Sequence, residues 1–518
     1  MIALDRRRSG VLLHPTSLPG PHGSGDAGPG AYHFVDWLVA AGQTAWQVLP
    51  LNPIGPGHSP YAGVSAFAGS PLLIALEPLI ESGWLAPIDV GEPAAFNARR
   101  IDYHRVVPWR MTRLRAAHAG FVARASGGRR TEFDDYCAAQ AGWLDDYALF
   151  MALDDAQHAR GSFAPWTQWD APLARREPAA LAAARAQHAE AISFWKFVQW
   201  CFDSQWAALK AYANDRGIVL VGDLPIFVSH HSADCWARPD LYLLDERFEP
   251  RVVAGVPPDY FSATGQRWGN PLYDWHAMQR DGYAWWIERV RRQTQLADLI
   301  RVDHFRGFAG CWEIPASCPT AVEGRWVPGP GAALFDALRA ALGKPPLIAE
   351  DLGVITPDVV ELRDRFGFPG MRILQFAFSD DANHSFLPHN YVENCCVYTG
   401  THDNDTTLGW WQSATERERA FAAEYVGATD GEFHWAMMRA ASASIARLAV
   451  FQMQDVLGLG SGHRMNTPGQ LDCWTWRFDW DMVGADSARR LARLTAAYGR
   501  APIAHLHLPE YPQGKARP

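Results

Sequence analysis

Cysteines and long hydrophobic runs are scarce in this sequence. Its 8 cysteines among 518 residues are too few for a disulfide framework, so we expect buried, reduced thiols. No stretch approaches the roughly 18 consecutive apolar residues of a membrane-spanning helix. The apolar run VLL at 11–13, which follows three arginines at 6–8, is too short for the core of a signal peptide. We therefore expect no membrane partner and a cytoplasmic location.

Positive charge is also in deficit. The 47 Lys and Arg residues against 56 Asp and Glu residues give a net charge of −9 at pH 7. A nucleic-acid-binding protein should instead show a basic excess or a basic stripe. The phosphate-binding patterns GxGxxG and GxxxxGK[ST] are absent in a strand–turn–helix context, and so is the GxSxG nucleophile elbow. The sequence thus predicts no nucleic-acid partner and supports neither nucleotide nor serine-hydrolase chemistry.

What the sequence does contain is eight short apolar runs that alternate with amphipathic helix patterns. Continuous apolar strands that alternate with helices are typical of a parallel sheet covered on both faces. Eight such units predict an α/β protein with a closed (β/α)8 barrel, the TIM barrel. The predicted strands are 10–14, 45–50, 218–223, 299–303, 347–351, 371–378, 397–403 and 448–455. The predicted helices between them include 32–41, 194–214, 282–296, 332–342, 357–366 and 417–426.

The spacing of these units is uneven. The long separation between the second and third predicted strands leaves room for an inserted, mainly helical subdomain over 80–190. The segment 228–281 is rich in proline, glycine and aromatic residues, which predicts an irregular inserted region that covers the active site. Since no linker or repeat divides the chain, we expect 1–518 to form a single catalytic barrel that carries these insertions.

Acidic residues follow four of the predicted strands. In a TIM barrel the carboxyl ends of the strands form the active-site rim, so these acids should meet there. Arg301 has the same side-chain parity as Asp303 and is predicted to point into the barrel beside it. Any one acid could instead cap a helix or form a structural ion pair, but a group of them at one rim favours a functional site. The acids are Asp223, Asp303, Glu350, Asp351 and Asp403.

Several carboxyl groups on one rim suit glycoside chemistry. That chemistry needs one carboxyl group to protonate the leaving oxygen and another to attack or to activate water. The aromatic segments 260–268 and 410–411 could provide faces for sugar rings. A metal-dependent barrel hydrolase is an alternative, although its ligand set should be more compact. The conceivable ligands are His14, His230, His231, His304, His402 and Asp403. A non-catalytic glucan-binding protein is a second alternative, which would not need an acid and a nucleophile.

Motifs spread over roughly residues 10–470 carry a family resemblance. Through them the chain resembles the amylomaltases, the 4-α-glucanotransferases of glycoside hydrolase family 77. The motifs are GVLLHPTSLPGPHGSGDAGP, WQVLPLNPIGPGHSPYAGVSAFAGSP, VGDLPIFV, VVAGVPPDYFSATGQRWGNPLYDW, IRVDHFRGF, WEIPASCPTAVEGRW, IAEDLGVITPDV, GMRILQFAF, YTGTHDNDTTLGWW and RMNTPG.

The resemblance implies a barrel without a separate C-terminal β-sandwich, no organic cofactor and no required metal. It implies transfer of an α-1,4-glucan segment to the 4-hydroxyl group of an acceptor glucan or glucose, with net retention. Asp303 would be the nucleophile, Glu350 the general acid and base, and Asp403 the third acid. Arg301 would keep Asp303 ionised by lowering its pKa. Hydrolysis of α-glucans on the same scaffold is the alternative activity.

The resemblance further implies a substrate cleft for maltooligosaccharides and a loop above it. We expect the 250–275 loop to act as a lid that excludes water and so favours transfer over hydrolysis. Two departures from the family pattern affect substrate contacts. Ala62 replaces a common Gln, and Asp472-Cys473 replaces Gly-Asn before Trp474. The substrate-binding residues implied by similarity are Ser59, Tyr61, Asp223, Tyr260, Phe261, Gln266, Trp268, Arg301, His304, Asp380, His402 and Asn466.

Overall fold

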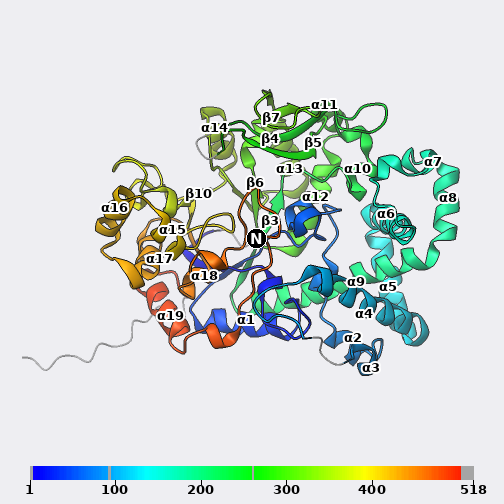
Figure 1. Ribbon diagram of the computed structural model, residues 1–518, viewed down its shortest axis with the longest axis horizontal. Helices are drawn as coiled ribbons and strands as arrows, with labels where there is room; N and C mark the ends of the chain where they lie inside the picture. The colour runs from blue at the N-terminus through cyan, green and yellow to red at the C-terminus, as the bar shows by residue number, and fades with distance from the viewer. Residues whose placement is uncertain (1–3, 92–94, 259–261, 503–518) are drawn as a thin grey trace, which may run out of the picture.

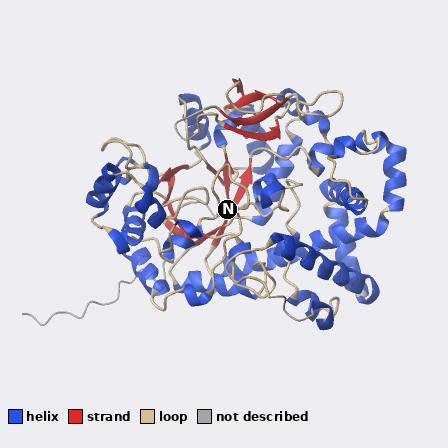
Figure 2. Cartoon of the chain, viewed as in Figure 1, coloured by secondary structure: helices blue, strands red, loops and turns tan. Residues whose placement is uncertain are grey.

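Eight short parallel strands form a closed barrel at the centre of the molecule. The computed structural model describes residues 4–91, 95–258 and 262–502, and its barrel strands follow the order β1-β12-β11-β10-β9-β6-β3-β2. Helices surround these strands (Figures 1 and 2), which confirms the predicted TIM barrel. The strands are β1 (Arg8–Leu12), β2 (Ala45–Gln47), β3 (Val219–Pro225), β6 (Leu299–Asp303), β9 (Leu347–Ala349), β10 (Gly370–Ile373), β11 (Cys395–Tyr398) and β12 (Leu448–Gln452).

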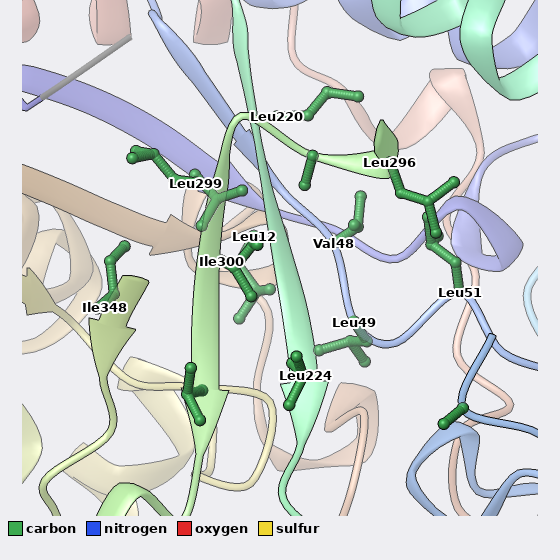
Figure 3. Close-up of a cluster of buried hydrophobic side chains, with 14 of the residues drawn as sticks. Leu12, Val48, Leu49, Leu51, Leu220, Leu224, Leu296, Leu299, Ile300 and Ile348 are labelled. Carbon is green, nitrogen blue, oxygen red and sulfur yellow. The ribbon is translucent and has the colours of Figure 1, made fainter. Parts of the chain in front are cut away.

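The barrel strands are buried because their side chains pack both inside the barrel and against the helices. Figure 3 shows Leu220, Leu299 and Ile348 within one cluster of buried hydrophobic side chains, and each of the three is at most 4% exposed. Burying a side chain of this size contributes about 1.5–3 kcal/mol. All eight predicted strands overlap barrel strands, but several predicted ranges extend into the loops that follow. Asp403, for example, lies in the loop after β11 rather than on the strand.

Capping residues fix the bounds of several helices. Helix α14 begins after Thr356 with a proline at its first position and ends at Gly367, whose φ of 67° suits a residue without a Cβ. The helices predicted at 332–342 and 357–366 have these same bounds in the structure, as α13 and α14. The helices up to β3 are α1 (Pro29–Ala40), α2 (Glu77–Glu81), α3 (Pro87–Val90), α4 (Tyr103–Arg124), α5 (Gly127–Ala139), α6 (Ala141–Ala159), α7 (Ala171–Ala174), α8 (Pro178–Gln187) and α9 (Ala189–Asp215). Those after β3 are α10 (Ala233–Ala237), α11 (Trp275–Arg280), α12 (Ala284–Leu296), α13 (Ala332–Leu342), α14 (Pro357–Phe366), α15 (Thr407–Ser413), α16 (Glu416–Val426), α17 (Phe433–Ala443), α18 (Met453–Val456) and α19 (Ser487–Ala497).

Helices α3 to α8 occupy the segment between β2 and β3 and extend to one side of the barrel (Figure 1). They attach to the long helix α9, whose C-terminal end leads into β3. The hydroxyl group of Tyr136 on α5 donates a hydrogen bond of 2.7 Å to Asp203 on α9. Among the described helices, none is both long enough and apolar enough to span a membrane.

The segment 228–281 contains more regular structure than its composition predicts. Strands β4 (Val252–Val256) and β5 (Gln266–Pro271) lie in it, together with helices α10 and α11. The two strands form an antiparallel sheet with β7 (Gly310–Pro315) and β8 (Arg325–Pro328), in the order β5-β4-β7-β8. The expectation that 228–281 is irregular is therefore wrong where these strands and helices form. Strand β4 pairs with β7, which follows β6 in the chain, so its hydrogen-bond partners are remote in sequence.

Gly10 marks a close approach of two barrel strands and yields a test of barrel packing. A Cβ atom at Gly10 would lie 2.6 Å from the carbonyl oxygen of Ala45 on the neighbouring strand β2. We expect Gly10→Ala to lower the free energy of unfolding by about 1–3 kcal/mol, because backbone atoms must move to admit the methyl group. Urea unfolding followed by circular dichroism measures this change.

The matched control is Gly128→Ala on α5, where an added Cβ meets no atom within 4 Å. Since alanine is the better helix former, we expect this variant to be as stable as the parent or more stable by up to about 1 kcal/mol. Equal effects of the two substitutions would contradict the packing argument.

Candidate active site

Arg301 lies between two carboxylates at the rim of the barrel. It is the register partner of Asp223 across strands β3 and β6, and Asp303 is two residues further along β6. The Nη1 atom of Arg301 donates to both carboxylate oxygens of Asp223 at 2.8 Å, and Nη2 lies 2.9 Å from Oδ1 of Asp303. The side chain of Arg301 is 3% exposed, whereas that of Asp303 is 29% exposed. Arg301 thus fixes one oxygen of Asp303 while part of the carboxylate stays accessible.

The pKa of Asp303 is raised to about 6, with burial as the largest cause. Arg301 lowers this pKa, but the negative charges of Asp223 and Asp403 raise it again. Arg301 thus acts on this pKa in the expected direction, but burial and the two neighbouring acids leave the net pKa of Asp303 raised. Burial removes water that would solvate the carboxylate, and Arg301 is shared with a second acid. A group with this pKa is still mostly ionised at neutral pH.

Glu350 follows β9 directly and is held by backbone amides. Its Oε2 accepts a hydrogen bond of 2.7 Å from the N–H of His304, and its Oε1 accepts one of 3.2 Å from the N–H of Leu352. His304 has a φ of 54°, a left-handed conformation uncommon for a residue with a side chain. The pKa of Glu350 is raised well above its ordinary value by burial first and also by the charge of Asp303. Burial thus raises the pKa of both carboxyl groups, and the negative charge of each neighbour adds to the effect.

Asp403 lies in the loop after β11 and is oriented from a later segment. The side-chain amide of Asn466 donates to Oδ1 of Asp403 at 2.6 Å, and Nε2 of His402 lies 3.4 Å from Oδ2. Arg464 donates a hydrogen bond of 2.8 Å to the Asp403 carbonyl oxygen. The carboxylate remains 42% exposed. This loop thus presents a fixed but accessible third acid.

Aromatic rings form one wall beside the acids. Tyr61 stacks on His402 with ring centroids 5.1 Å apart and an interplanar angle of 14°. Trp474 lies 5.7 Å from Tyr61 and 5.8 Å from His402, again between ring centroids. The Tyr61 hydroxyl group donates to Asp223 at 2.7 Å, and Oγ of Ser59 accepts a hydrogen bond of 3.2 Å from the Tyr61 N–H. The wall and the Arg301 cluster are therefore joined by hydrogen bonds.

The antiparallel sheet places one aromatic side chain near Glu350. Trp268 on β5 meets the ring of His304 edge to face, with centroids 4.8 Å apart, and its indole N–H donates to Gln266 at 3.1 Å. Tyr260 and Phe261, which were predicted to belong to the same loop, lie outside the described residues. Asp380 is exposed in the loop after β10. Among the described residues, no hydrogen bond or ion pair links it to the acids of the rim.

Three residues differ from what the sequence indicated. Asp351 does not face the cleft; it is buried, its Oδ1 accepts a 2.6 Å hydrogen bond from the Met371 N–H, and it is paired with Arg363. Arg464 and Trp474 belong to the site but were not predicted as site residues. Arg464 stands in the quoted motif RMNTPG, so a signal for it existed. In the described ranges no group of three or more His, Cys, Asp or Glu side chains could hold a metal ion.

The amino-acid sequence matches a known family over most of its length. The family model described as 4-alpha-glucanotransferase, glycoside hydrolase family 77, matches residues 13–482. A 4-alpha-glucanotransferase from Thermus thermophilus is 52% identical over 499 residues, which are 95% of this chain and 98% of the relative. A 4-alpha-glucanotransferase from Synechocystis sp. is 47% identical over 502 residues, 96% of this chain and 99% of the relative.

Solved structures agree with the sequence match. The amylomaltase from Streptococcus agalactiae in complex with acarbose has a TM-score of 0.92 and 37% sequence identity, and covers 96% of this chain and 100% of its own. The amylomaltase from Corynebacterium glutamicum has a TM-score of 0.76 at 21% identity, and covers 95% of this chain and 75% of its own. At that identity the second match supports the fold alone.

Replacement of the shared cation tests the electrostatic arrangement of the rim. We expect Arg301→Met to lower the free energy of unfolding by about 3–5 kcal/mol near neutral pH, because two carboxylates lose a buried partner. The substitution also removes the charge that lowers the pKa of Asp303, so that pKa rises further. A carboxyl group whose pKa is raised by folding destabilises the protein increasingly as the pH rises from its unfolded-state pKa, about 4, through its folded-state pKa. The loss should therefore be larger at pH 8 than at pH 5.

Urea unfolding at the two pH values measures this difference. Arg339→Met on α13 is the control, since Arg339 is 58% exposed and pairs with the half-exposed Asp336. We expect Arg339→Met to lower the free energy of unfolding by at most about 1 kcal/mol, because an exposed ion pair contributes little. An equal loss at pH 5 and pH 8 for Arg301→Met would show that the carboxylates do not depend on this charge.

Proposed function

The chain belongs to the 4-alpha-glucanotransferases of glycoside hydrolase family 77, and from this premise we propose that Asp303, Glu350 and Asp403 carry its activity. The donor and acceptor substrates are maltooligosaccharides and longer α-1,4-glucans. The observation that carries the proposal is the different surroundings of two neighbouring carboxyl groups at the rim. The Arg301 guanidinium lies 2.9 Å from one oxygen of Asp303 and favours its ionised form, whereas both oxygens of Glu350 accept backbone N–H groups and burial raises its pKa well above the ordinary value.

In the first step the Asp303 carboxylate attacks the anomeric carbon of the donor glucan. Glu350 transfers its proton to the glycosidic oxygen, so the bond to the leaving sugar breaks as the bond to Asp303 forms. Arg301 binds one oxygen of Asp303 and leaves the other available for attack. The product of this step is a covalent glucosyl-enzyme with inverted configuration.

In the second step the acceptor 4-hydroxyl group replaces Asp303. The ester at Asp303 carries no negative charge, so one cause of the raised pKa of Glu350 disappears. Glu350, now a carboxylate, accepts the hydroxyl proton while the acceptor oxygen attacks the anomeric carbon. The second inversion restores the α configuration, and Asp303 leaves as a carboxylate. The pKa of Glu350 thus changes in the direction that each step requires.

The remaining site residues bind and orient the sugar in this proposal. Asp403, held by Asn466 and His402, stabilises the positive charge that develops at the anomeric carbon. Tyr61 offers an aromatic face to a donor sugar ring. The other proposed substrate contacts are Ser59, Asp223, Tyr260, Phe261, Gln266, Trp268, Arg301, His304 and Asp380.

The products formed from maltotriose test the assignment of the three acids. Without nucleotide sugars or added metal, we expect the enzyme to form glucose together with a ladder of longer maltooligosaccharides. Chromatography detects both kinds of product. Asp303→Asn should lower kcat by about 10,000-fold or more, because it removes the nucleophile. Glu350→Gln should lower kcat by about 100-fold to 10,000-fold, because the residue loses its proton-transfer role.

The control is Asp364→Asn on α14, an acid whose side chain is 60% exposed. We expect its activity to stay within about twofold of the parent, as for most surface substitutions. Full activity of Asp303→Asn would contradict the proposed nucleophile. Glucose and maltose as the only products would instead indicate hydrolysis on the same scaffold.

Trp268 tests whether the sheet above the cleft limits access of water. Its ring edge lies against His304, whose backbone N–H binds Glu350. We expect Trp268→Ala to raise the hydrolysed fraction of turnovers about threefold to tenfold, because water competes better with the acceptor for the intermediate. Reducing-end release measured against ladder formation gives this ratio. Trp326→Ala on β8 is the control, because Trp326 is 42% exposed and Trp268 is 39% exposed, so the two substitutions remove tryptophans of similar exposure. Equal ratios in both variants would contradict the role of Trp268.

A further inference from the structure

A second cavity lies away from the acids, between the helical insertion and the barrel. It has a volume of about 440 Å³ and is lined by α6, α10, α12 and the segment 65–67. These helices occupy neighbouring positions beside the barrel (Figure 1). No catalytic residue proposed above lines it. Cavities of about 300–1,000 Å³ are typical of sites for small organic ligands.

Aromatic rings provide much of the cavity wall. Phe67 and Trp143 are stacked with centroids 6.2 Å apart at 16°, and Phe67 meets Trp285 edge to face at 5.8 Å. Trp143 is half-buried, whereas Phe67 and Trp285 are 6% and 9% exposed. The Trp143 indole N–H donates to Gln140 at 2.8 Å, which fixes its ring plane. A rigid ring plane at a cavity wall is suited to stacking against the apolar face of a ligand ring.

The charges around the cavity cancel one another. Its lining contains the three acids Asp146, Asp234 and Glu288 and the three arginines Arg238, Arg291 and Arg292. Most of these charges are paired within the protein: Arg176 binds Asp146 at 2.8 Å, and Arg238 binds Asp240 at 2.8 Å. Arg291 and Arg292 are likewise paired, with Glu288 and Asp203, so an anionic ligand would meet no lining arginine without a carboxylate partner. This balance favours a neutral ligand that forms hydrogen bonds.

One buried acid gives the cavity a fixed hydrogen-bond acceptor. Asp234 on α10 is 6% exposed, and its Oδ2 accepts a 2.8 Å hydrogen bond from the N–H of Ala66. Carboxylate oxygens have several lone pairs, so a hydroxyl group of a ligand can bind there as well. Side-chain amides of Gln140 and Gln295 also line the cavity. Flat aromatic faces with planar polar groups around them match a sugar ring, which has apolar C–H faces and a polar hydroxyl rim.

We propose that this cavity is a second α-glucan-binding site, which holds about one or two glucose units of a long glucan on the ring of Trp143. The choice of ligand rests on the glucan substrates proposed above, whereas the cavity and its lining do not. The segment 65–67 lies four residues after Tyr61 in the chain, so the cavity and the aromatic wall of the catalytic site share one stretch of backbone. A site of this kind raises affinity for long glucans through simultaneous binding and leaves short substrates unaffected.

The test compares long and short substrates in two variants of the full-length enzyme. Trp143→Ala removes the stacking surface. Gly142→Trp adds a side chain at a cavity-lining position where a Cβ meets no atom within 4 Å. We expect both variants to raise KM for amylose about fivefold to tenfold, because the loss of a stacked aromatic contact is of that order. We expect kcat/KM for maltotriose to stay within about twofold, since the catalytic cleft is intact.

The matched controls are Trp109→Ala and Gly127→Trp. Trp109 is a half-buried tryptophan on α4, and Gly127 on α5 also has open space at its Cβ position. Neither residue lines the cavity. Both controls should leave KM for amylose unchanged. Gly142→Trp keeps the test decisive even if Trp143→Ala fails to fold.

A crystal structure of Asp303→Asn soaked with maltotetraose locates the ligand directly. Sugar density stacked on Trp143, together with the amylose effect, supports the second site. An empty cavity with an occupied cleft overturns it, and so does sugar density without any change of KM for amylose, which means binding at crystal concentration only. Failure of the proposed function has a different signature, namely a parent enzyme that forms no products from maltotriose.

Discussion

The arrangement of the rim depends on one shared cation. Arg301 is almost fully buried and is bound by two carboxylates, both oxygens of Asp223 and one oxygen of Asp303. A charged group that is withdrawn from water destabilises the fold unless it has a partner of opposite charge. Removal of any one of the three groups would therefore leave another charge without its partner and lower the free energy of unfolding. The same sharing leaves Asp303 only partly compensated. Burial is the largest cause of its raised pKa, and a positive charge that is shared with Asp223 does not offset it.

The barrel places this local pairing within a larger group of acids at one rim. Parallel strands β3, β6 and β9 are neighbours, and their carboxyl ends place Asp223, Asp303 and Glu350 side by side. The left-handed turn at His304 directs a backbone N–H at Glu350, and a distant segment supplies Asn466 to Asp403. The three acids are thus held by three different means: a cation, backbone amides and a side-chain amide. Burial raises the pKa of Asp303 to about 6 and that of Glu350 well above its ordinary value.

Much of this architecture was predictable from local patterns. Each barrel strand is a short apolar run that is buried on both faces, and helices α13 and α14 begin and end at residues with clear capping signals. The antiparallel sheet was not predictable, because β4 pairs with β7 across β6 and no local pattern encodes that pairing. Asp351 illustrates the same limit. Its neighbour Glu350 faces the cleft, whereas Asp351 pairs with Arg363 on α14, which only the folded chain brings near.

The sequence by itself determined the fold class and the family and proposed the three acids, because these depend on periodicity and on motifs that are contiguous in the chain. The tertiary structure decided what each acid does as a charged group. The net pKa of Asp303 reflects burial and two acids that come from other strands and loops, and these outweigh Arg301, which lies two residues away. Coulomb energies and desolvation depend on distance in space rather than in sequence, so only the closed barrel fixes them.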